Sequence, residues 1–200
     1  MTTRRIAWSI AALVLVALVA LDRPAALARG RGSMGPAQRL LGPIASVAAS
    51  VEWIRFRVVL DGGDPARAYG HARRALDLDA RTPAGWVTLA DHFVFGRASP
   101  LEAEDAAERR KWIRAGLDVL ERGERRTAAP EDLAFYAAVV KATFLAGIPD
   151  EALGWPGGPR ALLEDARRDA ERALELGGPD AAAVLEFIAE RLRDLDEEGR

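Results

Sequence analysis

The stretch from Asp64 to Phe95, DPARAYGHARRALDLDARTPAGWVTLADHFVF, decides the fold predicted for this chain. It opens with Asp64, a residue suited to cap a helix, and with Pro65 at the first helical position, where a missing N–H costs nothing. Small and apolar residues then recur with the period of a helix and not of a strand: Ala68, Ala72, Ala75, Leu76 and Leu78. Thr82 and Pro83 restart the chain, so the stretch predicts one helix, a short turn and a second helix.

The second of these helices has an apolar face on which an aromatic residue is followed by leucine, a small residue and another aromatic residue. The four are Trp86, Leu89, Ala90 and Phe93. This spacing resembles the first helix of the tetratricopeptide repeat, and the preceding helix, which ends in ALDLDA at 75–80, is similar to that family's second helix. The resemblance implies helical hairpins that stack through small residues, with aromatic residues filling the space to the next hairpin. An irregular helical bundle is the alternative.

The same punctuation continues toward the C-terminus, and no segment shows the alternation typical of a strand. Ser99 and Glu102 have the spacing of a capping box. Helices are predicted to begin at prolines that follow glycines: Pro65, Pro83, Pro100, Pro130, Pro159 and Pro179. The predicted domain at 36–200 is therefore all-α, with about seven helices.

Later segments echo the opening stretch. Leu133, Tyr136, Ala137 and Val140 repeat the spacing of the second helix 47 residues later, and Ala166, Ala170 and Ala173 repeat the small positions of the first. The predicted repeats are hairpins at 36–79, 83–123 and 130–176, closed by a capping helix at 179–197. Extra sequence at 96–105 and 146–160 makes the repeats longer than in the family, and such insertions often contact a ligand.

The N-terminal 22 residues predict a membrane anchor or a signal peptide. Arg4 and Arg5 precede an uninterrupted apolar run at 6–21, which would span about 24 Å as a helix, slightly short of a ~30 Å bilayer core. Ala28 ends a small-x-small pattern, Ala26-Leu27-Ala28, typical of a cleavage site. The expectation is a single-pass anchor in a bacterial cell membrane with the C-terminal domain outside the cytoplasm, or export after cleavage following Ala28. Arginines beyond the run oppose that orientation.

Residues 23–35 are rich in arginine, glycine and alanine and are predicted to be a flexible linker. The linker contains the pattern G-x-G-x-x-G at Gly30, Gly32 and Gly35, but neither a strand nor a βαβ unit surrounds it, so it does not indicate a nucleotide site.

Composition narrows the classes of function. The net charge of −2 gives no basic footprint for nucleic acid. Cysteine is absent, which excludes disulfides, thiolate nucleophiles and thiolate metal sites. Arginine greatly outnumbers lysine and asparagine is absent, which indicates a GC-rich, bacterial genome.

The two histidines carry no local catalytic or metal-binding pattern. His71 and His92 lie in the middle of predicted helices, and neither has a second ligand three or four residues further along. A metal site or an acid–base pair would require tertiary contacts. The sequence therefore predicts no cofactor, no metal and no catalytic residue.

The resemblance also implies a concave surface formed by the first helix of each hairpin. By offset from the matched residues, it would display Trp53, Arg57, Asp91 and Lys141, together with Val87, Ala134 and Ala138. The alternative for Arg57, Asp91 and Lys141 is an internal network of ion pairs. Trp155, among proline and glycine in the 146–160 insertion, either plugs into the protein or forms a contact loop.

The function expected from these features is non-catalytic binding of an unidentified protein or peptide by a helical-repeat scaffold. One alternative is a hydrolase-like enzyme with an Asp/Glu/His site near 146–160. The other is a structural subunit that oligomerises through the amphipathic helix predicted at 36–60.

Overall fold

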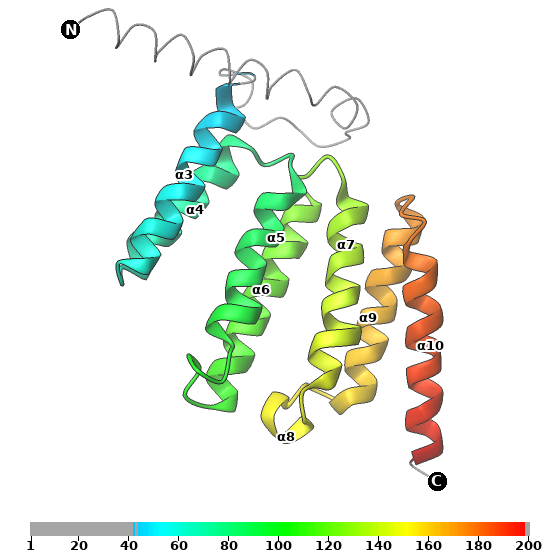
Figure 1. Ribbon diagram of the computed structural model, residues 1–200. Coiled ribbons are helices and arrows are strands. Elements are labelled where there is room, and N and C mark those ends of the chain that lie inside the picture. Colours follow the sequence, from blue (N-terminus) through cyan, green and yellow to red (C-terminus); the bar gives the residue numbers. More distant parts are fainter. Residues whose placement is uncertain (1–41, 43, 199–200) are drawn as a thin grey trace, which may run out of the picture. The chain divides into compact units, whose positions relative to one another are not determined.

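The structure, a computed structural model, describes residue 42 and residues 44–198, and this part of the chain is helical without any strand (Figure 1). The predicted all-α class is thereby confirmed. The anchor or signal segment at 1–22 and the linker at 23–35 lie outside the described residues. Among the helices that are described, none is both long enough and apolar enough to cross a membrane. The chain divides into two compact units, the first ending at Arg81 and the second beginning at Thr82.

The first unit is a hairpin of two helices, α3 (Ile44–Asp61) and α4 (Pro65–Leu78). The predicted start of α4 is confirmed, since an Oδ1 oxygen of Asp64 accepts a hydrogen bond from the backbone N–H of Arg67 at 3.0 Å. Gly63 has φ +81°, a conformation that other residues adopt at a cost, and it allows the tight turn before the cap. The facing sides are small: Ala45, Ala49, Ala68, Ala72 and Ala75 are all buried.

The second unit is a succession of helices in which each packs on the next along the chain (Figure 1). Helix α6 packs against both α5 and α7, which also contact each other, α7 packs against α9, and α9 packs against α10. The elements are α5 (Pro83–Asp91), η2 (His92–Arg97), α6 (Ala106–Glu124), α7 (Pro130–Val139), η3 (Val140–Phe144), η4 (Leu145–Gly147), α8 (Asp150–Leu153), α9 (Gly158–Glu175) and α10 (Ala181–Glu198). Segments η2 and η3 are π-helical, and η4 is a 3₁₀ turn.

The prediction that a helix begins at Pro100 is wrong. Residues 98–105 form turns, and α6 begins only at Ala106, after Asp105. An Oδ1 oxygen of Asp105 accepts from the Glu108 N–H at 2.8 Å, while Glu108 accepts from the Glu104 N–H at 3.1 Å. This reciprocal cap satisfies two backbone donors and outcompetes the cap predicted from Ser99.

Helix α6 approaches its neighbours closely because two of its residues are glycine. A Cβ atom on Gly123 would lie 2.5 Å from Leu133 Cδ1 and 2.7 Å from Trp86 Cγ. One on Gly116 would lie 2.5 Å from Val94 Cγ2. Helix α9 packs closely against its neighbours through alanines instead of glycines, since Ala166, Ala170 and Ala173 are fully buried. Close packing thus sets the helix spacing in both places.

Candidate interaction surface

Two hairpins of the second unit begin and end their first helix in the same way. Helices α5 and α7 start at Pro83 and Pro130, which are 47 residues apart, and each continues directly into a π-helical segment, η2 or η3. A π-helical turn is rare and is found disproportionately at functional sites. The sequence echo between these stretches therefore corresponds to a shared local geometry.

An exposed pair of aromatic rings lies where the two π-helical segments end. Phe95 of η2 is 41% exposed and Phe144 of η3 is 40% exposed. Their ring centroids are 4.5 Å apart and the ring planes meet at 64°, an edge-to-face contact. The pair brings together two residues 49 positions apart in the sequence. We call Phe95 and Phe144 the aromatic end.

Segment η2 is fixed to α6 by stacked side chains. Phe93 stacks on Trp112 with ring centroids 5.6 Å apart, and the Arg97 guanidinium lies 4.7 Å from the Trp112 ring. Arg97 also forms an ion pair with Glu102 at 3.0 Å, which ties the 98–105 loop to η2. The backbone that carries Phe95 is therefore held from two sides.

The predicted groove residue Asp91 lies at the junction of α5 and α7. Its carboxylate accepts a short hydrogen bond from the Tyr136 hydroxyl. Burial raises the pKa of Tyr136, and the hydrogen bond to the Asp91 carboxylate raises it further, so the hydroxyl keeps its proton as the donor. Asp91 thus joins two successive first helices.

Lys141, the other groove residue of this unit, forms an ion pair with Asp169 of α9 at 2.6 Å, and its side chain is 13% exposed. It lines a shallow hollow of about 200 Å³, which we call the acidic hollow. The lining residues are Leu117, Asp118, Glu121, Glu124, Ala137, Lys141 and Asp169. Glu124 is paired with Arg172 at 2.7 Å and Glu121 with Arg125 at 2.7 Å. Most of the charge in the hollow is therefore compensated by the protein's own side chains.

Two further groove positions are buried and not displayed. Ala134 packs with Ala173 and Ala181, and Ala138 packs with residues of α9 and α10, so both have 0% exposure. The prediction that Ala134 and Ala138 are displayed in the groove is wrong, because α9 and α10 cover this side of α7.

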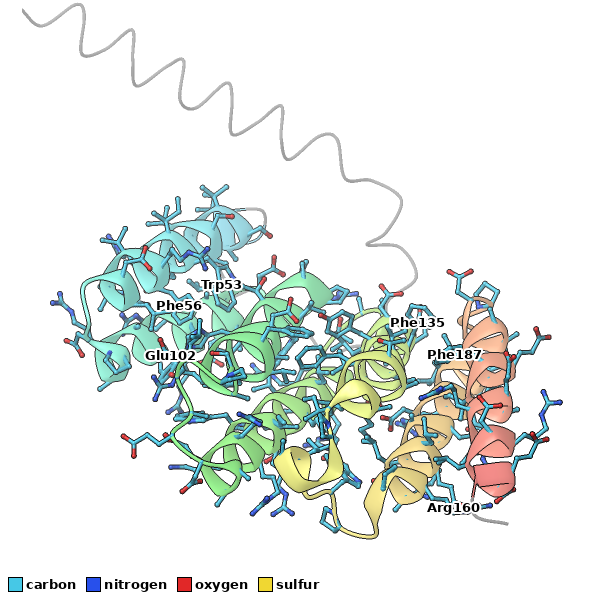
Figure 2. The ribbon with its side chains drawn as sticks, turned by 60° about the horizontal axis from the view of Figure 1, so that its bottom comes forward. Trp53, Phe56, Glu102, Phe135, Arg160 and Phe187 are labelled. Carbon is cyan, nitrogen blue, oxygen red and sulfur yellow. The ribbon has the colours of Figure 1, made fainter. Side chains whose placement is uncertain are left out.

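Trp53 and Arg57 lie on α3 of the first unit. Trp53 is half-buried and meets Phe56 edge-to-face with ring centroids 5.6 Å apart, whereas Arg57 is exposed. Figure 2 shows Trp53 and Phe56 on this helix. Within the second unit, Asp91 and Lys141 do not pair with each other, because each has its own partner.

A buried polar network closes the hairpin of the first unit. Glu52 is 8% exposed and His71 is 7% exposed. The Glu52 carboxylate lies 2.8 Å from His71 Nδ1, 2.9 Å from Arg74 Nε and 2.6 Å from Arg55 Nη1. The hydrogen bonds from His71 and Arg74 lower the pKa of Glu52 to about 2.

The ionised state of Glu52 decides the tautomer of His71. A carboxylate has no proton to give, so His71 Nδ1 must donate to Glu52. Arg74 Nη2 also lies 2.8 Å from this nitrogen, but a protonated Nδ1 cannot accept from it, and that contact is not a hydrogen bond. The network therefore works as a polar interior for the hairpin. Sequence analysis missed it, although a glutamate within the apolar pattern of 36–60 was an available signal.

The Trp155 ring is half-buried and packs against a buried cluster that includes Val140, Leu145 and Leu153. Its indole Nε1 donates to Asp165 at 3.3 Å. The loop is folded onto the unit, and a contact by Trp155 with a partner stays a prediction.

Within the part of the chain that the structure describes, no group of three or more His, Cys, Asp or Glu side chains is arranged to hold a metal ion. The glycine motif at 30–35 lies outside the described residues.

Comparison with models of known protein families, with curated proteins and with solved structures finds no match for this chain.

Proposed function

We propose that this chain is a non-catalytic helical-repeat scaffold of tetratricopeptide type that binds another protein. The aromatic end is the single observation that carries the proposal. Phe95 and Phe144 come from two successive hairpins, expose about two fifths of their surface each and are held in contact by the packing of those hairpins. Aromatic rings presented on a rigid support are typical centres of binding energy in protein interfaces.

The acidic hollow is the less suitable surface of the two. A partner that entered it would have to compete with the pairs Lys141–Asp169 and Glu124–Arg172, which are already formed. Replacing an existing ion pair by a new one yields little net free energy, because both are desolvated at a cost. Phe95 and Phe144, in contrast, gain from any apolar contact that removes them from water.

The apolar run at 6–21 supports a location at a bacterial membrane, with the helical domain outside the cytoplasm. Cleavage after Ala28 would instead release the same domain by export. In either case the proposed activity belongs to the helical domain, and the N-terminal segment determines only where it acts.

Site-specific photo-cross-linking in cells tests the proposal. A benzophenone amino acid replaces Phe95 or Phe144 in the full-length chain, and Leu174 of α9, which is 45% exposed, provides the matched control. We expect both test positions to capture the same discrete protein and Leu174 to capture none. The proposal is contradicted if neither test position gives an adduct, or if Leu174 gives the same one.

A further inference from the structure

Helix α3 is apolar on two opposite sides, and the described chain covers one of them. Ala45, Ala49 and Phe56 are buried on the side that faces α4. On the opposite side Ile44, Ile54 and Val58 are 64–65% exposed and Val51 is 42% exposed. These four are among the largest apolar exposures of the described residues. A second partner for α3 is therefore expected.

The exposed side has the spacing of a helix–helix seam. With the half-buried Val47 added to these four, Ile44, Val47, Val51, Ile54 and Val58 are separated alternately by three and four residues. They occupy roughly 80° of the helix circumference, narrower than the apolar face of a helix that rests on a globular core. All five are β-branched, and such residues are stiff and pack well as knobs in two-helix contacts. The pattern fits a single facing helix.

We propose that this seam binds the same seam of a second copy of the chain, with the two α3 helices antiparallel, an association separate from the partner binding proposed above. The two ends of the seam are equidistant from Val51, because Ile44 lies seven residues before it and Val58 seven residues after it, whereas the inner residues Val47 and Ile54 lie four residues before it and three after it. A two-fold axis through Val51 therefore places Ile44 of each copy against Val58 of the other. Such self-complementarity is what a two-fold symmetric interface requires.

The charges beside the seam select the antiparallel arrangement. Arg55 and Arg57 flank the C-terminal half, whereas Ala48 and Ser50 flank the N-terminal half. A parallel pair would place the arginines of the two copies side by side. An antiparallel pair places each arginine beside the uncharged half of the partner, and the two helix dipoles oppose each other favourably.

The size of the seam makes the association weak. Complete burial of an Ile or Val side chain removes about 60–120 Å² of apolar surface, so five of them contribute at most about 600 Å² per copy, against roughly 800 Å² in a stable complex. A reversible dimer is expected, and a covalent trap detects it better than a measurement of mass at equilibrium.

Cysteine cross-linking of the full-length chain in cell membranes tests the inference, since the chain has no cysteine of its own. On mild oxidation, Val51→Cys should form a disulfide-linked dimer, because the two-fold axis brings the two sulfurs together. Ile44→Cys and Val58→Cys should each stay monomeric alone and form a mixed dimer when expressed together. Arg73→Cys, exposed on α4, is the control for random collision.

Two variants of exposed residues distinguish an effect on the seam from an effect on folding. Ile54→Asp should abolish the Val51→Cys dimer, whereas Leu101→Asp, at a residue that is 95% exposed, should leave it intact. Dimers of Ile44→Cys alone and of Val58→Cys alone would show a parallel pair and overturn the arrangement. Equal cross-linking of Arg73→Cys would overturn the interface.

The same cysteine variants distinguish a second copy of the chain from two other possible partners of the seam, which are the chain's own apolar run at 6–21 and the lipid surface. A disulfide within one chain between Val51→Cys and Val14→Cys would assign the seam to the chain's own apolar run. A Val51→Cys thiol that never dimerises and reacts with a water-soluble maleimide only after detergent is added would assign it to the lipid surface. Either result rejects the second copy.

Discussion

The aromatic end and the acidic hollow belong to the same unit but present opposite chemistry. The aromatic end has two rings that touch each other and are two fifths exposed, while the hollow has carboxylates that mostly have cationic partners. The difference separates side chains that complete the fold from side chains that remain available. The charged residues of this unit that sequence analysis selected for a binding groove are therefore paired within the protein, whereas the surface that is free to bind a partner is apolar.

The largest expected effect is on binding at the aromatic end. With the photo-cross-linker at Phe95, Phe144→Asp should abolish capture of the partner, because a carboxylate replaces half of the apolar contact. The free energy of unfolding should fall by only about 1 kcal/mol, since the ring is 40% exposed. Leu174→Asp is the matched variant: Leu174 is 45% exposed, so the loss of stability should be similar, but capture should be kept.

A variant of the Glu52 network tests whether capture of the partner depends on the stability of the fold or on the exposed side chains of the aromatic end. Glu52→Ala should lower the stability of the α3–α4 hairpin by about 2 kcal/mol, because it leaves His71 and Arg74 without their acceptor. Hydrogen exchange of the two helices measures the loss. If capture at Phe95 falls as far as in Phe144→Asp, the cross-link reports on folding, and the assignment of the surface fails.

The same network predicts a dependence on acid. The pKa of Glu52 is depressed to about 2 from an ordinary 4.5, so its stabilising contribution is complete above pH 4.5 and disappears as the pH falls toward 2. The stability difference between the wild type and Glu52→Gln, from denaturant unfolding, should therefore shrink over that interval. A difference that stays constant would mean that the carboxylate is not ionised in the hairpin.

A smaller effect is expected for the ion pair at the edge of the acidic hollow. Lys141→Met keeps the aliphatic contacts of the side chain but leaves Asp169 without its partner, which should cost about 1 kcal/mol. Capture at Phe95 should not change. Loss of capture together with unchanged stability would instead assign Lys141 to the partner's binding surface, as the sequence comparison with the repeat suggested.

The smallest effect is expected from reversing charges in the hollow. Asp118 and Glu121 are exposed, so Asp118→Lys together with Glu121→Lys should change the free energy of unfolding by no more than about 0.5 kcal/mol. Cross-linking at Phe95 should keep its yield at low and at high salt. A yield that falls in the variant and depends on salt would move the binding surface from the aromatic end to the hollow.

The parts of the fold that sequence analysis predicted are those with local causes. Pro65, Pro83 and Pro130 begin helices, and Pro159 is the second residue of α9, because a fixed φ and a missing N–H suit the first turn of a helix wherever it occurs. Pro100 was predicted to do the same, but the stronger cap at Asp105 and Glu108 determines where α6 begins. Two local signals competed there, and only the packed structure shows which one prevails.

The candidate surface depended on tertiary packing and was less accessible to sequence analysis. A π-helical turn differs from an α-helical one by a single residue, and the choice is made by contacts with neighbouring helices. Phe95 nevertheless carried a signal, since in a regular helix it lies about 200° from Phe93 and so away from the apolar face. Gly123 lies one residue before the end of α6, where a glycine is expected, but its second role, which is to make room for Trp86, depends on tertiary packing.

Hydrogen exchange of the scaffold with and without the captured partner tests the central claim most directly. The account predicts new protection confined to the segments that carry the aromatic end, His92–Arg97 and Val140–Phe144, with residues 117–124 of α6 unchanged. Protection that maps to 117–124, or a bound partner that protects neither π-helical segment, would contradict it.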